Sequence, residues 1–220
     1  MDSMLDRTDN PRHRRKEARP RELLNAALAL FVEKGFAGST AEDIAARAGV
    51  SKATLYLYFA SKDDLLKQLI ADGFASHVDI EELEITDDMA SGELLRDALT
   101  AWRSALMEGD AGGILKLVCT EVRRFPELAD LWSRDLIEPV RRLVSRLVLR
   151  GIARGEFRRV EPDIVVHALV SPLIVMCLHR HAISPHVAPD SLPRLPELFS
   201  QYFEFVLEGL LQDRTIARPP

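Results

Sequence analysis

Residues 40–59 read TAEDIAARAGVSKATLYLYF, a sequence with the features of two short helices joined by a turn. Thr40, followed three residues later by Asp43, has the pattern of a helix N-terminal cap, and Ser51 has the pattern of a second one. Gly49 lies between the two predicted helices, where it permits a tight turn. Two short helices joined by such a turn are typical of a helix-turn-helix, whose second helix lies in the major groove of DNA.

The residue types inside this stretch fit two helices that pack closely. Ala45 and Ala48 are small, Val50 fits the angle between the helices, and Leu55 can anchor the second helix inward. The residues left for the outer face are Ser51, Lys52, Ala53, Thr54, Tyr56 and Tyr58. Lysine and threonine can donate to bases or phosphates, and tyrosine hydroxyls can reach phosphates. The alternative is a helical hairpin in a core, but the second helix is too short to bury all its tyrosines.

The charge of the chain is uneven. Residues 1–70 carry 12 Lys+Arg and 10 Asp+Glu, whereas residues 71–220 carry 17 and 24, so a polyanion should meet the N-terminal end. Six cations fall close together: Arg12, Arg14, Arg15, Lys16, Arg19 and Arg21. We expect residues 1–20 to form a flexible arm, either solvated or touching phosphates or the minor groove, with Arg19 and Arg21 as candidate DNA contacts.

Helical spacing of apolar residues recurs along the chain, and no stretch alternates with a period of two. Helices are expected at about 21–34, 41–48, 52–58, 61–76, 94–106, 114–124, 127–154, 162–181 and 197–211. Pro139 should kink or divide the longest of them, and residues 77–92 are typical of an irregular link. The predicted fold is all-α with about nine helices, a three-helix DNA-binding head at 21–66 and a helical-bundle body for ligand sensing and dimerisation at 67–220.

Composition and motifs exclude several other classes of protein. Cys119 and Cys177 form neither a disulfide framework nor a CxxC metal pair, which favours the reducing cytoplasm. The longest apolar stretch, Ile164–Leu178, is shorter than the roughly 20 residues that span a bilayer, so we expect a buried helix and no membrane. No secretory signal, Gly-rich phosphate loop, HExxH or GxSxG motif is visible. We therefore expect no enzyme activity, no cofactor and no metal site.

The stretch from Arg21 to Leu66 resembles the DNA-binding domain of TetR-family transcriptional regulators. The matching segments are LLNAALALFVEKGF, ST, IAARAGVSKATLYLYF and SKDDLL, which agree in content, order and spacing. The resemblance implies a homodimer with one head per protomer, bound to a palindromic operator in double-stranded DNA. It also implies a body that senses a small-molecule effector and releases DNA on binding it.

Matching family positions imply particular DNA contacts in this sequence. Thr40 matches a phosphate contact from the first helix of the motif, and Lys62 matches a backbone-contacting lysine just after the motif. The recognition helix would carry Ser51, Lys52, Ala53, Thr54 and Tyr56, and would end at Tyr58. Position 53 is often glycine in the family, and alanine there still lets the backbone approach DNA closely.

The ligand site of the body is inferred from local chemistry alone. Side chains that could line an apolar cavity with a few polar anchors are Trp102, Met107, Cys119, Arg123, Trp132, His167 and Met176, with Leu117 and Leu136 beside them. Arg123 could bind a carboxylate, or it could lie on a solvated helix face or in an interface salt bridge. Each of the others could instead be ordinary core, and His167 a satisfied core histidine. The segment RGIARGEFR at residues 150–158 is similar to one common in the regulatory halves of the family.

Two helices near the C-terminus are too apolar to face water. The helix at 163–181 is apolar nearly all round and the last helix is crowded with apolar residues, so a second copy should bury both in a four-helix bundle. The expected interface residues are Leu169, Leu173, Phe199, Tyr202, Phe203, Val206 and Leu210. Ligand binding would change head separation through the helix at 61–76. A body that binds protein partners, a need for a corepressor, and activation in place of repression stay open.

Overall fold

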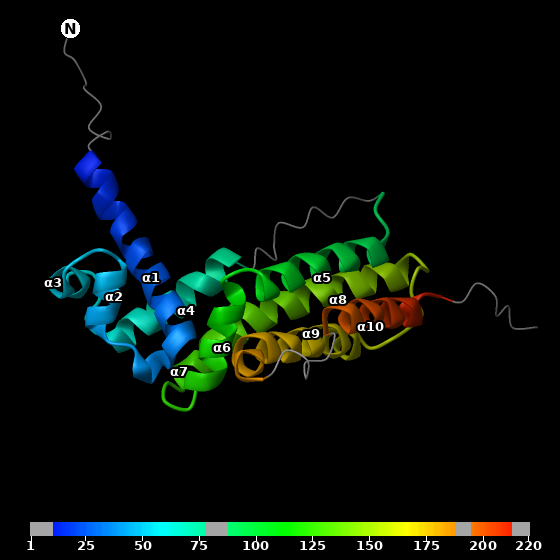
Figure 1. Ribbon diagram of the computed structural model, residues 1–220. Helices are drawn as coiled ribbons and strands as arrows, with labels where there is room; N and C mark the ends of the chain where they lie inside the picture. The colour runs from blue at the N-terminus through cyan, green and yellow to red at the C-terminus, as the bar shows by residue number, and fades with distance from the viewer. Residues whose placement is uncertain (1–10, 78–87, 188–194, 213–220) are drawn as a thin grey trace, which may run out of the picture. The chain divides into compact units, whose positions relative to one another are not determined.

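A computed structural model of the chain describes residues 11–77, 88–187 and 195–212 (Figure 1). Over these residues the chain is helical, with one isolated β-bridge and no strand. The helices form nine continuous runs in the described ranges, which confirms the predicted all-α fold. Contacts between residues divide the chain into two compact units. They are the head, Met1–Ile70, and the body, Ala71–Pro220.

The head is built from three helices and the start of a fourth. They are α1 (Pro11–Gly38), α2 (Ala41–Arg47), α3 (Lys52–Tyr56) and α4 (Lys62–His77), the last of which continues into the second unit. One face of each helix supplies the core, whose fully buried side chains include Leu23, Ala27, Phe31, Phe36, Ile44, Leu55, Leu65 and Leu66. The Phe31 and Phe36 rings pack with centroids 5.2 Å apart, on either side of the kink in α1.

Helix α1 begins earlier than the sequence analysis expects. The predicted arm reaches residue 20, whereas the backbone is helical from Pro11. Arginine, lysine, glutamate and alanine dominate this stretch and have high helix propensity, and Pro20 removes one backbone hydrogen bond without ending the helix. The basic cluster is therefore carried on helical backbone, in turns of α1 that extend past α2 and α3 (Figure 1). Residues 1–10 of the predicted arm lie outside the described residues.

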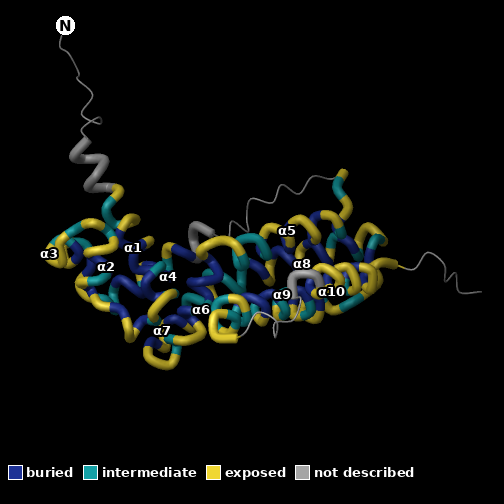
Figure 2. Tube along the Cα trace, viewed as in Figure 1, coloured by how far each residue is buried: buried dark blue, intermediate teal, exposed yellow. Residues whose placement is uncertain are grey.

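The body packs its helices around α8 and α9. Its elements are α5 (Ser91–Met107), α6 (Ala111–Glu121), α7 (Glu127–Leu131), η1 (Trp132–Ile137), α8 (Glu138–Ala153), α9 (Pro162–Leu178), η2 (His179–Ile183), η3 (Ser184–His186) and α10 (Leu195–Leu210). Helix α8 packs against α5 and α9, and α9 also packs against α6 and α10. Buried residues follow the inner faces of these helices (Figure 2). Most of the predicted link at 77–92 lies outside the described residues.

Two runs in the body widen into π-helical turns close to prolines. The π-helical η1 directly precedes α8, in which Pro139 lacks an N–H and would clash with the carbonyl four residues earlier in a regular α-helix. The wider turn absorbs this misfit and lets the run continue. The helical run is continuous through Pro139, so the predicted division does not occur there, and the predicted kink stays a prediction. The second π-helical turn, η2, likewise precedes a proline, Pro185 in η3.

The RGIARGEFR segment ties together the ends of three body helices. Arg150 donates to Ser91 Oγ at 3.0 Å, and the Glu156 carboxylate accepts from Ser91 N at 2.7 Å, which joins the end of α8 to the start of α5. Arg158 Nε donates to the Gly209 carbonyl at 2.6 Å, near the end of α10. These bonds give a structural role to a segment whose sequence is only similar to one found in the family.

One helical run among the described residues, Pro162–His186, is long and apolar enough to cross a membrane by length and composition alone. The core helix of a globular domain meets the same two criteria. In the body, Val165, Leu169 and Leu173 of this run are buried against neighbouring helices. Packing inside the body therefore accounts for part of its apolar character, since 33% of its most apolar stretch is buried.

Candidate nucleic-acid interface and body pocket

Side-chain caps fix the two helices of the motif and the turn between them. Thr40 Oγ1 accepts from Asp43 N at 3.1 Å and the Asp43 carboxylate accepts from Thr40 N at 3.1 Å, so the two residues form a capping box. Gly49 has a φ of +66°, which an L side chain rarely adopts. Ser51 Oγ accepts from Thr54 N at 3.1 Å and caps α3. Both helices of the motif thus begin at the predicted caps.

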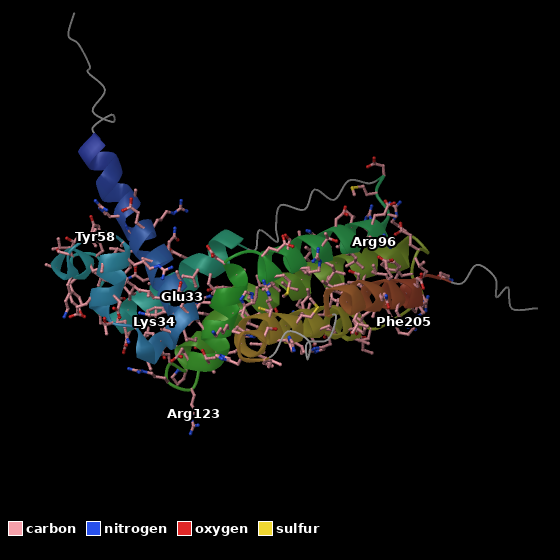
Figure 3. All side chains as sticks on the ribbon, viewed as in Figure 1. Glu33, Lys34, Tyr58, Arg96, Arg123 and Phe205 are labelled. Atoms are coloured by element: carbon pink, nitrogen blue, oxygen red, sulfur yellow. The ribbon has the colours of Figure 1, made fainter. Side chains whose placement is uncertain are left out.

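Helix α3 is anchored on one side and exposed on the other. Leu55 and Phe59 are buried in the head core, so the helix cannot roll or slide without losing that packing. Of the predicted outer-face residues, the structure exposes Ser51, Lys52, Ala53 and Tyr56 and half-buries Thr54 and Tyr58. Figure 3 labels Tyr58 beside α3. A rigid helix with one polar and aromatic face has the form that groove reading requires.

The Lys52 ammonium is paired within the head. It contacts the Glu42 carboxylate on α2 and lies 5.8 Å from the centroid of the Tyr56 ring. The hydrogen bond between the two side chains raises the pKa of Lys52 and lowers the pKa of Glu42. Both groups are therefore charged at neutral pH. To contact DNA as predicted, Lys52 must exchange a carboxylate for a phosphate or a base.

Lys62 ties α4 to the junction between α1 and α2. Its Nζ donates to the Phe36 and Ser39 carbonyls, both at 2.8 Å, and lies 4.2 Å from the centroid of the Phe36 ring. Ser39 is itself buried, with its hydroxyl 2.9 Å from the Gly35 carbonyl. Lys62 is thus a positioning residue of the head, and its predicted phosphate contact stays a prediction.

The remaining predicted DNA contacts lie on the surface of the head. Thr40 and Arg21 are exposed, and Arg19 forms an ion pair with Glu22 at 2.8 Å. Another exposed cation of the head, Arg47, pairs with Glu33, which Figure 3 labels, at 2.8 Å. Several cations of the head thus lie beside carboxylates, and their attraction to DNA requires that these partners be exchanged.

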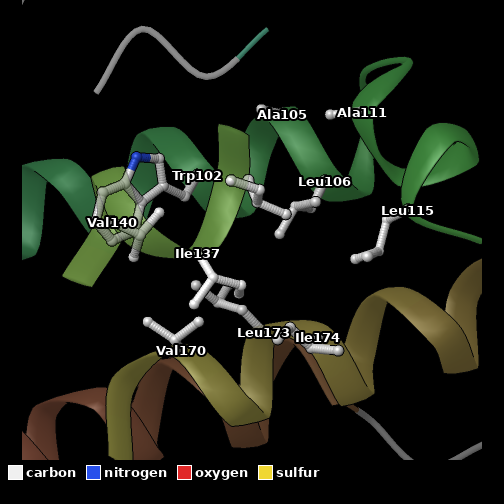
Figure 4. Close-up of a pocket in the computed structure, with 11 residues that line it drawn as sticks. Trp102, Ala105, Leu106, Ala111, Leu115, Ile137, Val140, Val170, Leu173 and Ile174 are labelled. Atoms are coloured by element: carbon white, nitrogen blue, oxygen red, sulfur yellow. The ribbon is translucent and has the colours of Figure 1, made fainter. Parts of the chain in front are cut away.

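An apolar pocket lies inside the body (Figure 4). Its cavity volume is about 40 Å³, and it lies between α5, α6, η1, α8 and α9. The lining residues are Trp102, Ala105, Leu106, Ala111, Leu115, Leu136, Ile137, Val140, Val170, Leu173 and Ile174. No lining side chain carries a charge or a hydroxyl. A molecule bound here would therefore be held through shape and dispersion rather than through polar anchors.

The seven predicted ligand residues do not share one site in the structure. Trp102 lines the pocket, as does the additional candidate Leu136. Met176 is buried in the core, Met107 and Trp132 are half-buried, and Cys119, Arg123 and His167 are exposed. The Arg123 side chain points away from the body (Figure 3). Because His167 is exposed, it is not a core histidine. The aliphatic lining was missed because its spacing is that of ordinary core.

The two C-terminal helices present an apolar outer face. Its side chains are Ile164 and Val175 on α9 and Leu198, Tyr202 and Phe205 on α10, of which Phe205 is 73% exposed (Figure 3). Among the predicted interface residues, Leu169, Leu173, Phe199, Phe203 and Leu210 are buried inside the body, Val206 is half-buried and Tyr202 is exposed. The buried residues hold these helices in place from within, whereas a partner would meet the outer face.

Reactive groups are scarce in the described ranges. No group of three or more His, Cys, Asp or Glu side chains there could hold a metal ion. Burial raises the pKa of the Cys177 thiol to about 12, so this sulfur is protonated at neutral pH and is a poor nucleophile.

Two family models match the chain, one in each unit. Residues 23–69 match the model described as bacterial regulatory proteins, tetR family, and these residues include the capped motif. Residues 91–193 match the model described as tetracyclin repressor-like, C-terminal domain, and these include every residue that lines the pocket.

Known proteins similar to the chain are regulators. The uncharacterized HTH-type transcriptional regulator YfiR of Bacillus subtilis is 30% identical over 158 residues, 67% of this chain and 72% of that protein. A regulatory protein of the tetR family from Rhodococcus RHA1 has a TM-score of 0.65 at 19% identity, over 89% of this chain and 98% of that one. The ketosteroid transcriptional regulator KstR2 of Mycobacterium tuberculosis has a TM-score of 0.61 at 25% identity, over 89% and 96%.

Proposed function

Because the chain belongs to the TetR family and is a DNA-binding transcriptional regulator rather than an enzyme, we propose that it is a dimeric repressor that a small, largely apolar ligand releases from a palindromic operator. The observation that carries the proposal is the capped, anchored helix α3 with its polar outer face. The protein would act in the cytoplasm.

We assign DNA recognition to the head, residues 21–66, with the basic turns of α1 before it. Lys52 and Tyr56 lie one helical turn apart on the exposed face of α3 and can reach base edges and phosphates together. Two heads related by a twofold axis would place their recognition helices in successive major grooves, about 34 Å apart. An inverted repeat is the operator that such a dimer selects.

The outer face of α9 and α10 supports dimerisation. Ile164, Val175 and Phe205 are each more than 60% exposed, a grouping of large apolar side chains that a monomer would leave in water. Tyr202 donates to the Ala168 carbonyl at 2.9 Å, which holds the two helices together as one surface. A second copy would bury this surface in a four-helix bundle across the twofold axis.

The chemistry of the body pocket supports an uncharged inducer. A ligand charge placed among these side chains would find no opposite charge, with the Trp102 indole N–H as the one polar group of the lining side chains, and would carry a large desolvation cost. The cavity volume of about 40 Å³ is well below that of usual small-molecule sites, so binding of an inducer would require the surrounding helices to move apart. A related regulator is named for ketosteroids, a class of mainly hydrocarbon ring compounds, and this name agrees in kind with the pocket.

Regulation would be a coupling free energy between ligand and operator. A ligand that favours a head separation different from the groove spacing lowers operator affinity by the same factor by which DNA lowers ligand affinity. Helix α4, which belongs to both units along the chain, is the segment we expect to carry this change.

Selection of random duplex DNA by the purified protein tests the DNA half of the proposal. We expect enrichment of an inverted repeat by the wild type and none by a Lys52→Ala, Tyr56→Ala double variant. Arg146→Ala, which removes an exposed cation from α8, is the matched control and should enrich the same site. No enrichment by the wild type, or the same enrichment by the double variant, would overturn the proposal.

Release of the selected operator by paired compounds tests the ligand half. An alcohol and a carboxylate with the same hydrocarbon skeleton differ mainly in charge at neutral pH. We expect neutral members, including steroid ketones, to release DNA at concentrations at least about tenfold below those of their charged partners. Release by the carboxylates alone would contradict an uncharged inducer.

A further inference from the structure

Leu57 is the most exposed large apolar side chain among the described residues, at 82%. It follows Tyr56, the last residue of α3, and none of the predicted DNA contacts includes it. The flanking anchors Leu55 and Phe59 are 0% and 2% exposed. The backbone N–H of Leu57 donates to the Thr54 carbonyl at 3.2 Å. The side chain is therefore held outward by a rigid backbone.

Leu57 continues an apolar strip along the recognition helix. Ala53 lies four residues earlier and is also exposed, so its methyl group and the Leu57 side chain share one face. Lys52 and Tyr56 form the neighbouring row with the same spacing. The exposed surface of α3 thus combines a polar row with an apolar one.

A single exposed leucine is ordinary on a protein surface, but its place on this helix gives it meaning. Helix α3 is the element that a TetR-family head inserts into the major groove, so this strip is continuous with the DNA-binding surface. Neither Ala53 nor Leu57 can donate or accept a side-chain hydrogen bond. The apolar group that base edges present in the major groove is the C5-methyl group of thymine.

We propose that Leu57, assisted by Ala53, reads the C5-methyl group of a thymine in each operator half-site and so helps to set the sequence preference of the protein. The inference rests on the operator binding proposed above and adds a residue and a base identity to it. Leu57 would distinguish thymine from cytosine through the methyl group, whereas Lys52 and Tyr56 contribute hydrogen bonds.

Replacement of thymine by deoxyuridine tests this proposal, because it removes the methyl group and leaves the pairing edge intact. Each thymine of the selected operator is replaced in turn, and the dissociation constants of wild type and Leu57→Ala are measured. At one position per half-site, wild type should bind about fourfold more weakly after replacement, and about fifteenfold when both half-sites are changed. Leu57→Ala should lose that sensitivity and keep the response at other positions.

Two control variants separate base reading from general effects. Leu57→Met keeps a long apolar side chain and should retain most of the sensitivity to the methyl group. Leu149→Ala removes a leucine that is 56% exposed on α8 and should behave as wild type. Thermal unfolding should be unchanged in Leu57→Ala, since the side chain makes little contact within the head.

Three results would overturn the proposal: a wild type insensitive to every replacement, a Leu57→Ala variant as sensitive as wild type, and an affinity loss in that variant that is equal for all operators. The third would mean that Leu57 touches only the sugar-phosphate backbone. A wild type that selects no sequence would overturn operator binding as well, so the two failures are distinguishable.

Discussion

The head and the body use opposite means to make a binding surface. In the head, the proposed recognition surface lies mostly within residues 51–58, where Ser51 caps α3 and Lys52 pairs with Glu42. In the body, five helical elements between Trp102 and Ile174 supply the pocket, and its aliphatic side chains are chemically alike. We infer that operator preference can change through one substitution, whereas ligand preference is spread over many residues.

The largest effect is expected where the body makes its outer face. Phe205→Arg should convert the dimer to monomers, because a charge replaces a ring that is 73% exposed in the protomer. With one half-site engaged at a time, operator affinity should fall by about a hundredfold or more. Sedimentation equilibrium and operator binding measure the two effects.

Phe203→Arg is the contrasting variant. Phe203 is 7% exposed and packs edge-on against Phe199 with ring centroids 4.0 Å apart, so its replacement should destabilise the body by about 3–5 kcal/mol. A dimer that survives Phe205→Arg would place the interface elsewhere.

Gly151→Ala tests how strictly the body is packed. A Cβ at this position would lie 2.2 Å from the ring of the buried Phe157, so we expect a loss of about 1–3 kcal/mol in unfolding free energy. Gly209→Ala is the control: no atom lies within 4 Å of its Cβ, and stability should rise by up to about 1 kcal/mol. The melting temperature should fall in Gly151→Ala and rise in Gly209→Ala. Equal shifts in the two variants would contradict the close packing at Gly151.

Ala105→Phe should fill the pocket without affecting the head. Ala105 lines the pocket (Figure 4), so a ring there should weaken inducer binding by at least about tenfold, while operator affinity stays within about twofold. Ala101→Phe makes the same change at an exposed position of α5 and should leave induction unaltered. Titration of each variant with inducer, followed by the release of operator DNA, distinguishes the two variants. Normal induction in Ala105→Phe would mean that the ligand binds elsewhere.

The smallest effect is expected from Glu42→Gln, which removes the partner of Lys52. Operator affinity should rise by about two- to fivefold, because Lys52 no longer exchanges a carboxylate for DNA. The lowered pKa of Glu42 keeps it charged, so the ion pair is present at neutral pH and is lost only as pH falls through that lowered value. The difference between variant and wild type should therefore be constant from about pH 6 to 8. Weaker operator binding would show that Glu42 positions Lys52 productively.

The difference between head and body also explains how far the sequence could predict the structure. The caps Thr40 and Ser51 and the turn at Gly49 are local signals, because the partner of each lies within a few residues. The residues that line the pocket could not be predicted from the sequence, because Val140 and Ile174 come together only when helices distant in the sequence pack. At the C-terminus, apolar crowding marked the helices, but inner residues such as Phe203 and outer ones such as Phe205 look alike in composition.

The bonds around Glu156 and Arg158 also set the order in which the chain can mature during synthesis. The contacts described within the head are complete once residue 70 has been made. In the body, Ser91 bonds to Glu156, Arg158 bonds to Gly209, and Arg96 forms a two-pronged ion pair with Glu204, 108 residues away. Domains emerge from the ribosome N-terminal part first, and distant pairings form slowly. The head can therefore be finished while the body is still open, and the last helix completes the body.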